Sequence, residues 1–260
     1  MKEKRKNRKG QLSIFIIIAI VIVIALVVLL LFRKDIQSWI SPTGAQEYIR
    51  DCAEQYTEEA LQKLEMQGGS LEPENYLLYE DNKVDYTCYT EDYLKRCVMQ
   101  KPFLKQNIEQ ELASYIEPRV RGCFEEVESQ LERSGSVVTV SQVKVETSLV
   151  PNSIVVTIRA PTTIRREGAV RYDNFKAEVD SEIYELVMLA SSISNYEARY
   201  GDSDTIPYMM YYPDIRVEKI ERDLGRVYIL THKPSDEKFI FASRSIAWPA
   251  GYLGIDDELQ

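Results

Sequence analysis

The sequence predicts an α+β fold, in which an N-terminal transmembrane helix precedes an exposed domain of long helices and antiparallel strands. Three observations predict it. An uninterrupted apolar run fills residues 12–32, apolar residues recur at helical spacing over residues 43–67 and 104–131, and an alternation of period two begins after Ser136. Helices that are segregated from runs of antiparallel strands are typical of α+β domains.

The apolar run of residues 12–32 contains one hydroxyl and no charge. At about 1.5 Å per residue it spans the roughly 30 Å hydrocarbon layer of a lipid bilayer. A secretory signal peptide would have a shorter apolar region and a small-residue cleavage site, whereas Arg33 and Lys34 follow this run directly. Residues 1–10 carry a net charge of +5. We therefore expect residues 11–40 to form a single-pass anchor in the cell membrane, with a cytoplasmic N-terminus and an extracellular body.

Residues 8–13, with the sequence RKGQLS directly before the apolar helix, resemble the class III signal peptide of archaeal type IV pilin-like proteins. In that family a prepilin-type peptidase cuts after the glycine. The resemblance implies that this peptidase is a partner, that the cut falls between Gly10 and Gln11, and that residues 1–10 are a basic leader. Many members have glutamate at the fifth mature position, where this sequence has Phe15, which weakens the case for filament assembly. The alternative is an uncleaved anchor.

The chain after the anchor resembles, more loosely, archaeal membrane-anchored surface proteins. In these proteins such an anchor precedes a cysteine-containing helix that ends in a Gln-Gly-Gly turn. The corresponding stretch here runs from Ile49 through Cys52 to the turn at residues 67–69. The resemblance implies a place on the cell surface and supplies no activity.

Residues 41–133 are expected to form a helical part with a short hairpin. One helix begins near Thr43 and is ended by two successive glycines, a common helix-terminating signal. Residues 75–79 and 84–89 are expected to pair as the hairpin. A second helix follows over residues 104–131, and Pro118 in its middle should kink or split it because proline lacks a backbone N–H.

Residues 134–260 are expected to form an antiparallel β-rich part with one helix, and residues 41–260 together could be a single domain. The helix covers residues 181–200 and stops at Gly201. The alternation of apolar and polar residues and the turn signals between them predict strands at residues 143–146, 154–159, 162–167, 169–180, 215–220, 226–231 and 238–242.

The four cysteines allow three pairings. An oxidising exterior favours disulfides over thiols, and the absence of a C-x₂-C spacing argues against a closed zinc site. Cys52 and Cys123 share the pattern [IV]-R-x-C-x-E-[QE] and lie on the apolar stripes of the two predicted helices, so we expect them to pair. Cys88 and Cys97, near the hairpin, would then form the second bridge. The alternative is four buried free cysteines.

Several activities are disfavoured by what the sequence lacks. The chain after Lys34 carries a net charge of −16, which repels phosphate and argues against nucleic acid as a partner. His232 is the only histidine, and we expect it to be an exposed residue at the end of a strand. G-x-S-x-G, G-x-G-x-x-G and P-loop motifs are missing. We therefore assign no catalytic residue, metal site or cofactor.

Tyrosine is abundant, with 17 residues in the chain. Clustered tyrosine and methionine side chains suit protein binding because they combine a large apolar area with a polar tip or a flexible stem. The candidate contact with other surface proteins is the run Tyr208, Met209, Met210, Tyr211 and Tyr212, for which a place in the core is the alternative. The sequence thus predicts a membrane-anchored interaction or envelope protein. The alternatives are a minor subunit of a pilus-like filament and a tethered envelope enzyme that uses carboxylates.

Overall fold

The computed structural model describes residues 18, 20–24, 42–92, 95–166, 168–222 and 225–245. These residues form a mixture of helices and sheets, in agreement with the predicted α+β class. In this part of the chain, no helix is both long enough and apolar enough to cross a membrane. The leader, the cleavage site at Gly10 and Gln11, and most of the anchor predicted at residues 11–40 lie outside the described residues.

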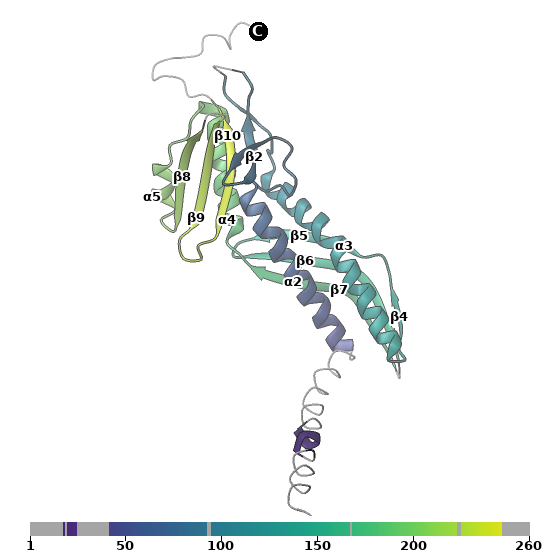
Figure 1. Ribbon diagram of the computed structural model, residues 1–260. Helices are drawn as coiled ribbons and strands as arrows, with labels where there is room; N and C mark the ends of the chain where they lie inside the picture. Colours follow the sequence, from purple (N-terminus) through teal and green to yellow (C-terminus); the bar gives the residue numbers. More distant parts are fainter. Residues whose placement is uncertain are drawn as a thin grey trace, which may run out of the picture.

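Two long helices and an antiparallel sheet form one half of the molecule (Figure 1), which we call the four-stranded half. Strand β6 is its centre: β7 pairs with one edge, and β4 and β5 pair with successive segments of the other. The helices lie against this sheet, α3 mainly on β5 and α2 on β7. The elements are α2 (Pro42–Met66), α3 (Leu104–Arg133), β4 (Val137–Val140), β5 (Lys144–Val150), β6 (Ser153–Arg165) and β7 (Ala169–Asp180).

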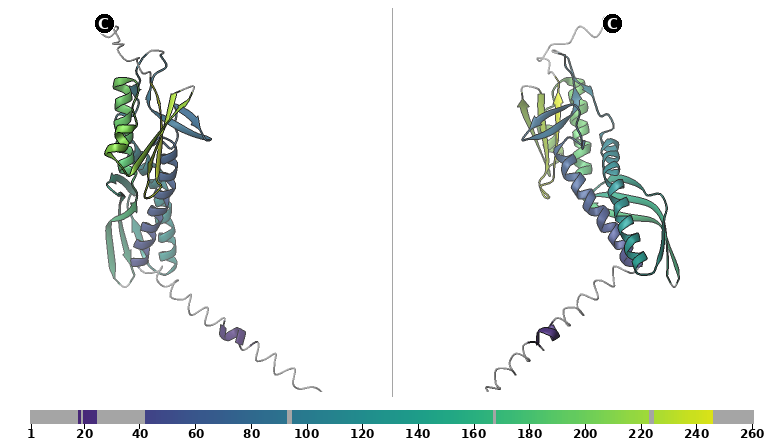
Figure 2. Two further views of the ribbon diagram at one scale, coloured as in Figure 1. Left: turned by 90° about the vertical axis from the view of Figure 1, so that its left-hand side faces the viewer. Right: turned by 45° about the vertical axis from the view of Figure 1, so that its right-hand side comes forward.

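The remaining elements form the six-stranded half, whose sheet has the order β1-β2-β10-β9-β8, with β3 also paired to β2. All pairs are antiparallel except β2 with β10. Figure 2 shows α4 alongside this sheet, where it contacts β10 and β2, while α5 contacts β8. The elements are β1 (Tyr76–Tyr79), β2 (Asn82–Tyr89), β3 (Val98–Met99), α4 (Ile183–Tyr200), α5 (Ile206–Tyr211), β8 (Ile215–Arg222), β9 (Gly225–His232) and β10 (Lys238–Arg244).

One predicted element boundary is wrong, and one of the two outcomes predicted for Pro118 is not observed. The strands expected at residues 154–159 and 162–167 form the single strand β6, which stays extended through Pro161 and shifts its register with β7 there. Helix α3 continues through Pro118 instead of splitting. Next to the proline, the guanidinium of Arg119 donates to the carbonyl oxygen of Tyr115 at 2.8 Å. Elements β3, β4 and α5 were not anticipated.

The turn after α2 depends on Gly68 and Gly69, which adopt positive φ angles of 70° and 80°. The N–H of Gly69 donates to the carbonyl of Leu64, which ends the helix. A Cβ on Gly68 would lie 2.9 Å from the carbonyl oxygen of Asp85, and one on Gly69 would lie 2.7 Å from the side chain of Ile108. Glycine at both positions therefore lets the turn fit between β2 and α3.

One hydrophobic core connects the two halves. It contains Ile49 of α2, Ile108 of α3, Ile154 of β6, Ile193 of α4 and Phe239 of β10, all nearly or completely buried. The sequence segments 41–133 and 134–260 also share a sheet, because β2 from the first lies beside β10 from the second. These contacts fix α4 and α5 relative to the rest of the described chain.

Candidate functional site

A groove of about 490 Å³ lies between α4 and α5. Its walls are mainly aromatic: Tyr196 comes from α4, and Tyr208, Tyr211 and Tyr212 come from α5 and the residue after it. Tyr211 exposes 83% of its surface to solvent, so its ring stands at the mouth of the groove. Tyrosine rings that line an open groove provide a large contact area with polar hydroxyl tips.

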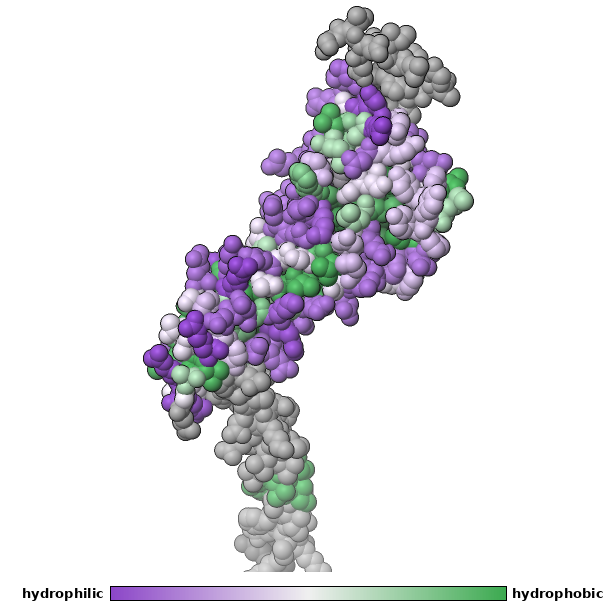
Figure 3. Space-filling view, turned by 180° about the vertical axis from the view of Figure 1, so that it is seen from behind, coloured by the Kyte–Doolittle hydropathy of each residue, from purple (hydrophilic) through white to green (hydrophobic). Residues whose placement is uncertain are grey.

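The exposed apolar surface extends beyond the groove itself. Met210 is 77% exposed, and the ring of Tyr200 lies 4.5 Å from that of Tyr196 on the outside of α4. On the face of the molecule that Figure 3 shows from behind, the surface is mostly hydrophilic, with scattered hydrophobic patches. A cluster of exposed tyrosine and methionine side chains is typical of a protein contact surface.

The structure divides the tyrosine–methionine run that the sequence singled out. Tyr208 and Met209 pack against the core, and Met209 is not among the residues that line the groove. Met210, Tyr211 and Tyr212 are exposed. Thus the core alternative holds for Met209, the surface interpretation fits the last three residues, and Tyr208 contributes to both the core and the groove.

The turn between α4 and α5 forms the floor of the groove and is held by charged side chains. The nitrogen Nζ of Lys219 donates to Oδ1 of Asp202 at 2.8 Å and to the carbonyl of Ser203 at 3.1 Å. The guanidinium of Arg226 donates to the carbonyl of Gly201 at 3.0 Å. Because the strands β8 and β9 supply these two cations, the sheet fixes the position of the turn.

Glu197, whose side chain is completely buried, lies at the centre of this arrangement. Its carboxylate accepts hydrogen bonds from the backbone N–H of Ser203 at 3.2 Å, from Arg226 at 2.9 Å, from Ser243 at 3.0 Å and from the hydroxyl of Tyr228. A buried carboxylate is tolerated when its oxygens are paired in this way. Glu197 therefore ties the end of α4 to the sheet and to the groove floor.

Burial raises the pKa of Glu197 above its usual value, although the positive charge of Arg226 opposes this shift. Burial also raises the pKa of the Tyr228 hydroxyl, and the Glu197 carboxylate adds to this increase. The tyrosine therefore stays protonated and keeps donating to the carboxylate. These groups use their hydrogen-bonding capacity on one another, which indicates a structural role.

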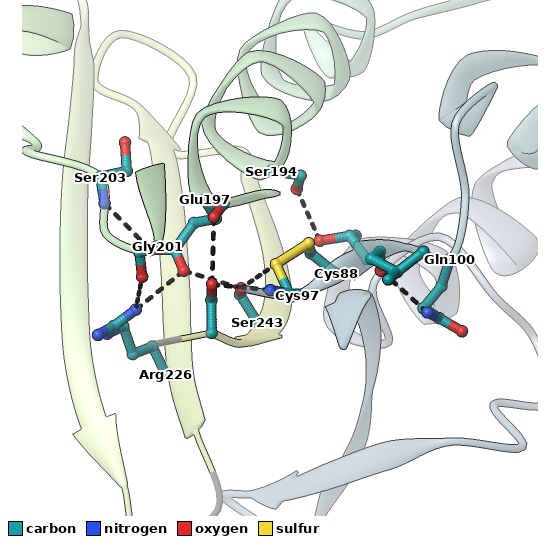
Figure 4. The surroundings of a disulfide bond; sticks show 12 residues. Cys88, Cys97, Gln100, Ser194, Glu197, Gly201, Ser203, Arg226 and Ser243 are labelled. Carbon is teal, nitrogen blue, oxygen red and sulfur yellow. Dashed lines mark hydrogen bonds and ion pairs between the residues drawn. A yellow bond between two sulfur atoms is a disulfide. The ribbon is translucent and has the colours of Figure 1, made fainter. Parts of the chain in front are cut away.

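The disulfide between Cys88 and Cys97 lies next to this cluster, as Figure 4 shows. The backbone N–H of Cys97 donates to the hydroxyl of Ser245 at 3.0 Å, which in turn donates to the carbonyl of Glu197 at 3.1 Å. The other cysteine of the pair, Cys88, lies at the end of β2. The disulfide loop is thus attached to α4 through the same residue that fixes the groove floor.

The second disulfide connects Cys52 of α2 with Cys123 of α3, so the predicted pairing of all four cysteines is confirmed. An open pocket of about 460 Å³ lies beside it and includes Glu47 and Asp51 in its lining. The nearby hydroxyl of Tyr48 donates to Glu126 at 2.6 Å. These contacts join the first turns of α2 to the later part of α3.

Two carboxyl groups that are far apart in the sequence converge at the end of α2. Burial and a hydrogen bond with Glu237 raise the pKa of Glu65 to about 9. Glu237 also accepts hydrogen bonds from the hydroxyl of Ser181 and from the backbone N–H of Glu182, at the start of α4. Neither Glu65 nor Glu237 lines the groove or the pocket beside Cys52. The pair therefore fastens three elements together.

Other candidate chemistry is limited within the described residues. His232 ends β9 as expected but is half-buried, and its Nδ1 lies 2.7 Å from the hydroxyl of Ser235 in the turn to β10. No group of three or more histidine, cysteine or acidic side chains suited to a metal ion occurs in the part of the chain that the structure describes.

The sequence analysis missed Glu197 and Tyr196, although a signal for each was present. Glu197 falls on the same helical stripe as Ala190 and Ile193, where a carboxylate among buried apolar residues indicates a buried polar cluster. Tyr196 lies next to it on the exposed face.

Comparison with protein-family models, curated proteins and solved structures finds no match to this chain.

Proposed function

We propose that this chain is a membrane-tethered cell-surface protein whose body binds another surface component through the groove between α4 and α5. The observation that carries this proposal is the cluster of exposed aromatic side chains around a groove whose floor is fixed. Tyr211 is 83% exposed, although tyrosine in a monomeric protein is usually more buried. Tyrosine residues that line a preformed groove are common anchors of binding interfaces.

The proposed location rests on the sequence and on the disulfides. Residues 12–32 are long and apolar enough for a bilayer-spanning helix, and the six cations before them favour a cytoplasmic N-terminus. Two disulfides are typical of domains that face an oxidising compartment. Residues 8–13 support processing by a prepilin-type peptidase, so that the mature chain would begin at Gln11.

An enzymatic role through paired carboxylates is less well supported. Glu65 and Glu237 do converge, but Glu237 already accepts from the hydroxyl of Ser181 and from the N–H of Glu182. Acid–base catalysis also requires a cavity in which the pair faces a substrate. The contacts of Glu237 favour a structural role for this pair.

The test uses the full-length protein in its native membrane. A photo-crosslinking phenylalanine derivative replaces Tyr211 in one variant and Tyr76, a less exposed tyrosine on β1, in a matched control. We expect a discrete covalent adduct from position 211 alone, and protease added to intact cells should degrade the body. Equal adducts at both positions, or a protected body, would contradict the proposal. Recovery mainly in sheared extracellular fibres would favour a filament subunit.

A further inference from the structure

The groove between α4 and α5 has a composition that restricts its occupant. Tyr196, Tyr208, Tyr211 and Tyr212 present flat rings and hydroxyl groups, and Pro207 adds a further apolar surface. Asp204 is the charged member of the eight described residues that line the groove. Asp204 precedes α5 in the chain. Its Oδ1 accepts a hydrogen bond from the backbone N–H of Ile206 at 3.0 Å, and this contact holds the carboxylate at the groove.

The groove is formed before a ligand arrives. Glu197 accepts from the N–H of Ser203, while Lys219 and Arg226 hold the carbonyl oxygens of the same turn. Tyr208 packs against the core behind the groove. A site that needs little rearrangement favours a ligand that is itself extended and loses little conformational entropy on binding.

We propose that the occupant is a proline-rich polypeptide segment in the polyproline II conformation, with a basic residue beside the prolines. This inference rests on the proposed function of the groove as a binding surface. A polyproline II segment has no internal hydrogen bonds, so its carbonyl groups are free to accept from tyrosine hydroxyls, while its proline rings pack on the aromatic faces. Asp204 then pairs with the basic residue.

Charge separates this occupant from other partners. The chain carries a net charge of −9, and one of its carboxylates, that of Asp204, lies at the groove. A second copy of this chain would bring like charges together, and the phosphates of nucleic acid would be repelled. A neutral oligosaccharide can donate hydroxyl hydrogen bonds to Asp204 but carries no positive charge to pair with it. A basic, proline-rich segment matches both the apolar rings and the charge.

The experiment measures the binding of labelled peptides to the full-length protein in lipid nanodiscs by fluorescence anisotropy. The probe is a nonapeptide with four prolines on each side of one arginine. In one control peptide glutamate replaces the arginine, and in the other glycine and serine replace the prolines. We expect the probe to bind at least fivefold more tightly than the first control and at least tenfold more tightly than the second. Added salt should reduce the difference in affinity between the arginine probe and the glutamate control, because salt screens the charge of Asp204.

Protein variants test where the peptide binds. Tyr211→Ala should weaken binding of the probe about tenfold, the usual effect of removing an aromatic anchor. Asp204→Asn should remove the preference for arginine over glutamate. Tyr76→Ala, on the far edge strand β1, should change the affinity less than twofold. Equal effects of the changes at residues 211 and 76 would overturn the assignment of the groove.

Three results separate this inference from the proposed function. Tight binding of the glycine–serine peptide, or of cellohexaose in place of the proline peptide, would overturn the proline-rich occupant. Discrete photo-adducts at Tyr211 in membranes without binding of the proline probe would overturn the occupant and keep the groove as an interaction surface. Neither adducts nor probe binding would overturn both.

Discussion

The two halves of the molecule share one hydrophobic core, and the six-stranded half adds a buried charged cluster to it. In the four-stranded half, apolar side chains of α2, α3 and β5–β7 pack together, one disulfide links the helices, and Glu109 of α3 accepts from the N–H of Leu149 at 2.8 Å. In the six-stranded half, a buried carboxylate, an arginine and a tyrosine hydroxyl meet beside the groove. Apolar contacts are non-directional, whereas hydrogen-bonded charges require one geometry. The buried charged cluster lies beside the groove that we propose as a binding surface.

Replacing Glu197 should produce the largest loss of stability. Glu197→Leu leaves Arg226 without its buried partner and Tyr228 without its acceptor, so we expect the free energy of unfolding to fall by about 3–5 kcal/mol. Urea denaturation of the full-length protein in detergent measures the change. The conservative Glu197→Gln variant should lose less, because its amide oxygen still accepts from Ser203. Losses below about 1 kcal/mol for both variants would show that the buried charge does not hold this half together.

The two disulfides provide the next comparison. Removing Cys52–Cys123 by a double alanine substitution should lower the free energy of unfolding by about 2–4 kcal/mol, because the bond closes the longer loop. Cys88 and Cys97 are separated by only 9 residues, so removing their disulfide should lower the free energy of unfolding less. The loss should be smaller than that for Cys52–Cys123 by about 1–2 kcal/mol.

The order of the two disulfides should be reversed when the effect on the groove is measured instead of stability. The Cys88–Cys97 variant should weaken photo-crosslinking at Tyr211, since this disulfide loop is hydrogen-bonded to the residue that fixes the groove floor. The Cys52–Cys123 variant should leave crosslinking unchanged. The same crosslinking yield in both variants would remove the distinction between the halves.

The carboxyl pair at Glu65 should make stability depend on pH. The folded pKa of about 9 lies above the usual 4.5, so the bound proton stabilises the fold fully below pH 4.5, and this stabilisation is lost as the pH rises through 9. Glu65→Gln cannot ionise, so its stability relative to the wild type should increase steadily as the pH rises from 5 to 9. Glu58→Gln, on the exposed side of α2, is the control. If the free energy of unfolding of the wild type and of Glu65→Gln changed with pH in the same way, the raised pKa of Glu65 would be contradicted.

The smallest effect on stability is expected at the mouth of the groove. Tyr211→Ala should change the free energy of unfolding by less than about 0.5 kcal/mol, because the side chain is 83% exposed. Its effect on binding should nevertheless be large. Thermal denaturation, measured together with peptide binding, distinguishes the two roles. A large loss of stability in this variant would assign the side chain to the fold.

Local patterns in the sequence predicted much of this architecture. The apolar stripes located α2, α3 and α4, and the positions of Cys52 and Cys123 on two stripes predicted that these helices face each other. The parallel pairing of β2 with β10 joins segments more than 140 residues apart, and no local pattern encodes it. The groove depends on the same long-range contacts, because Arg226 and Lys219 reach its floor from strands that follow it in the chain. The tyrosine run was visible, but its division between core and surface depends on how α5 lies against β8.

The disulfide between Cys52 and Cys123 also determines how the body would carry mechanical load. If the chain is anchored before α2 and bound at the groove, as we propose, pulling on the bound partner brings tension in at the start of α2, and this tension crosses the disulfide into α3. The chain between the two cysteines, separated by 71 positions, is bypassed. Unravelling it would otherwise lengthen the protein by about 250 Å. The bond therefore limits extension to the first turns of α2 and to the segments after Cys123, and keeps the core contacts of α2 beyond Cys52 under little strain.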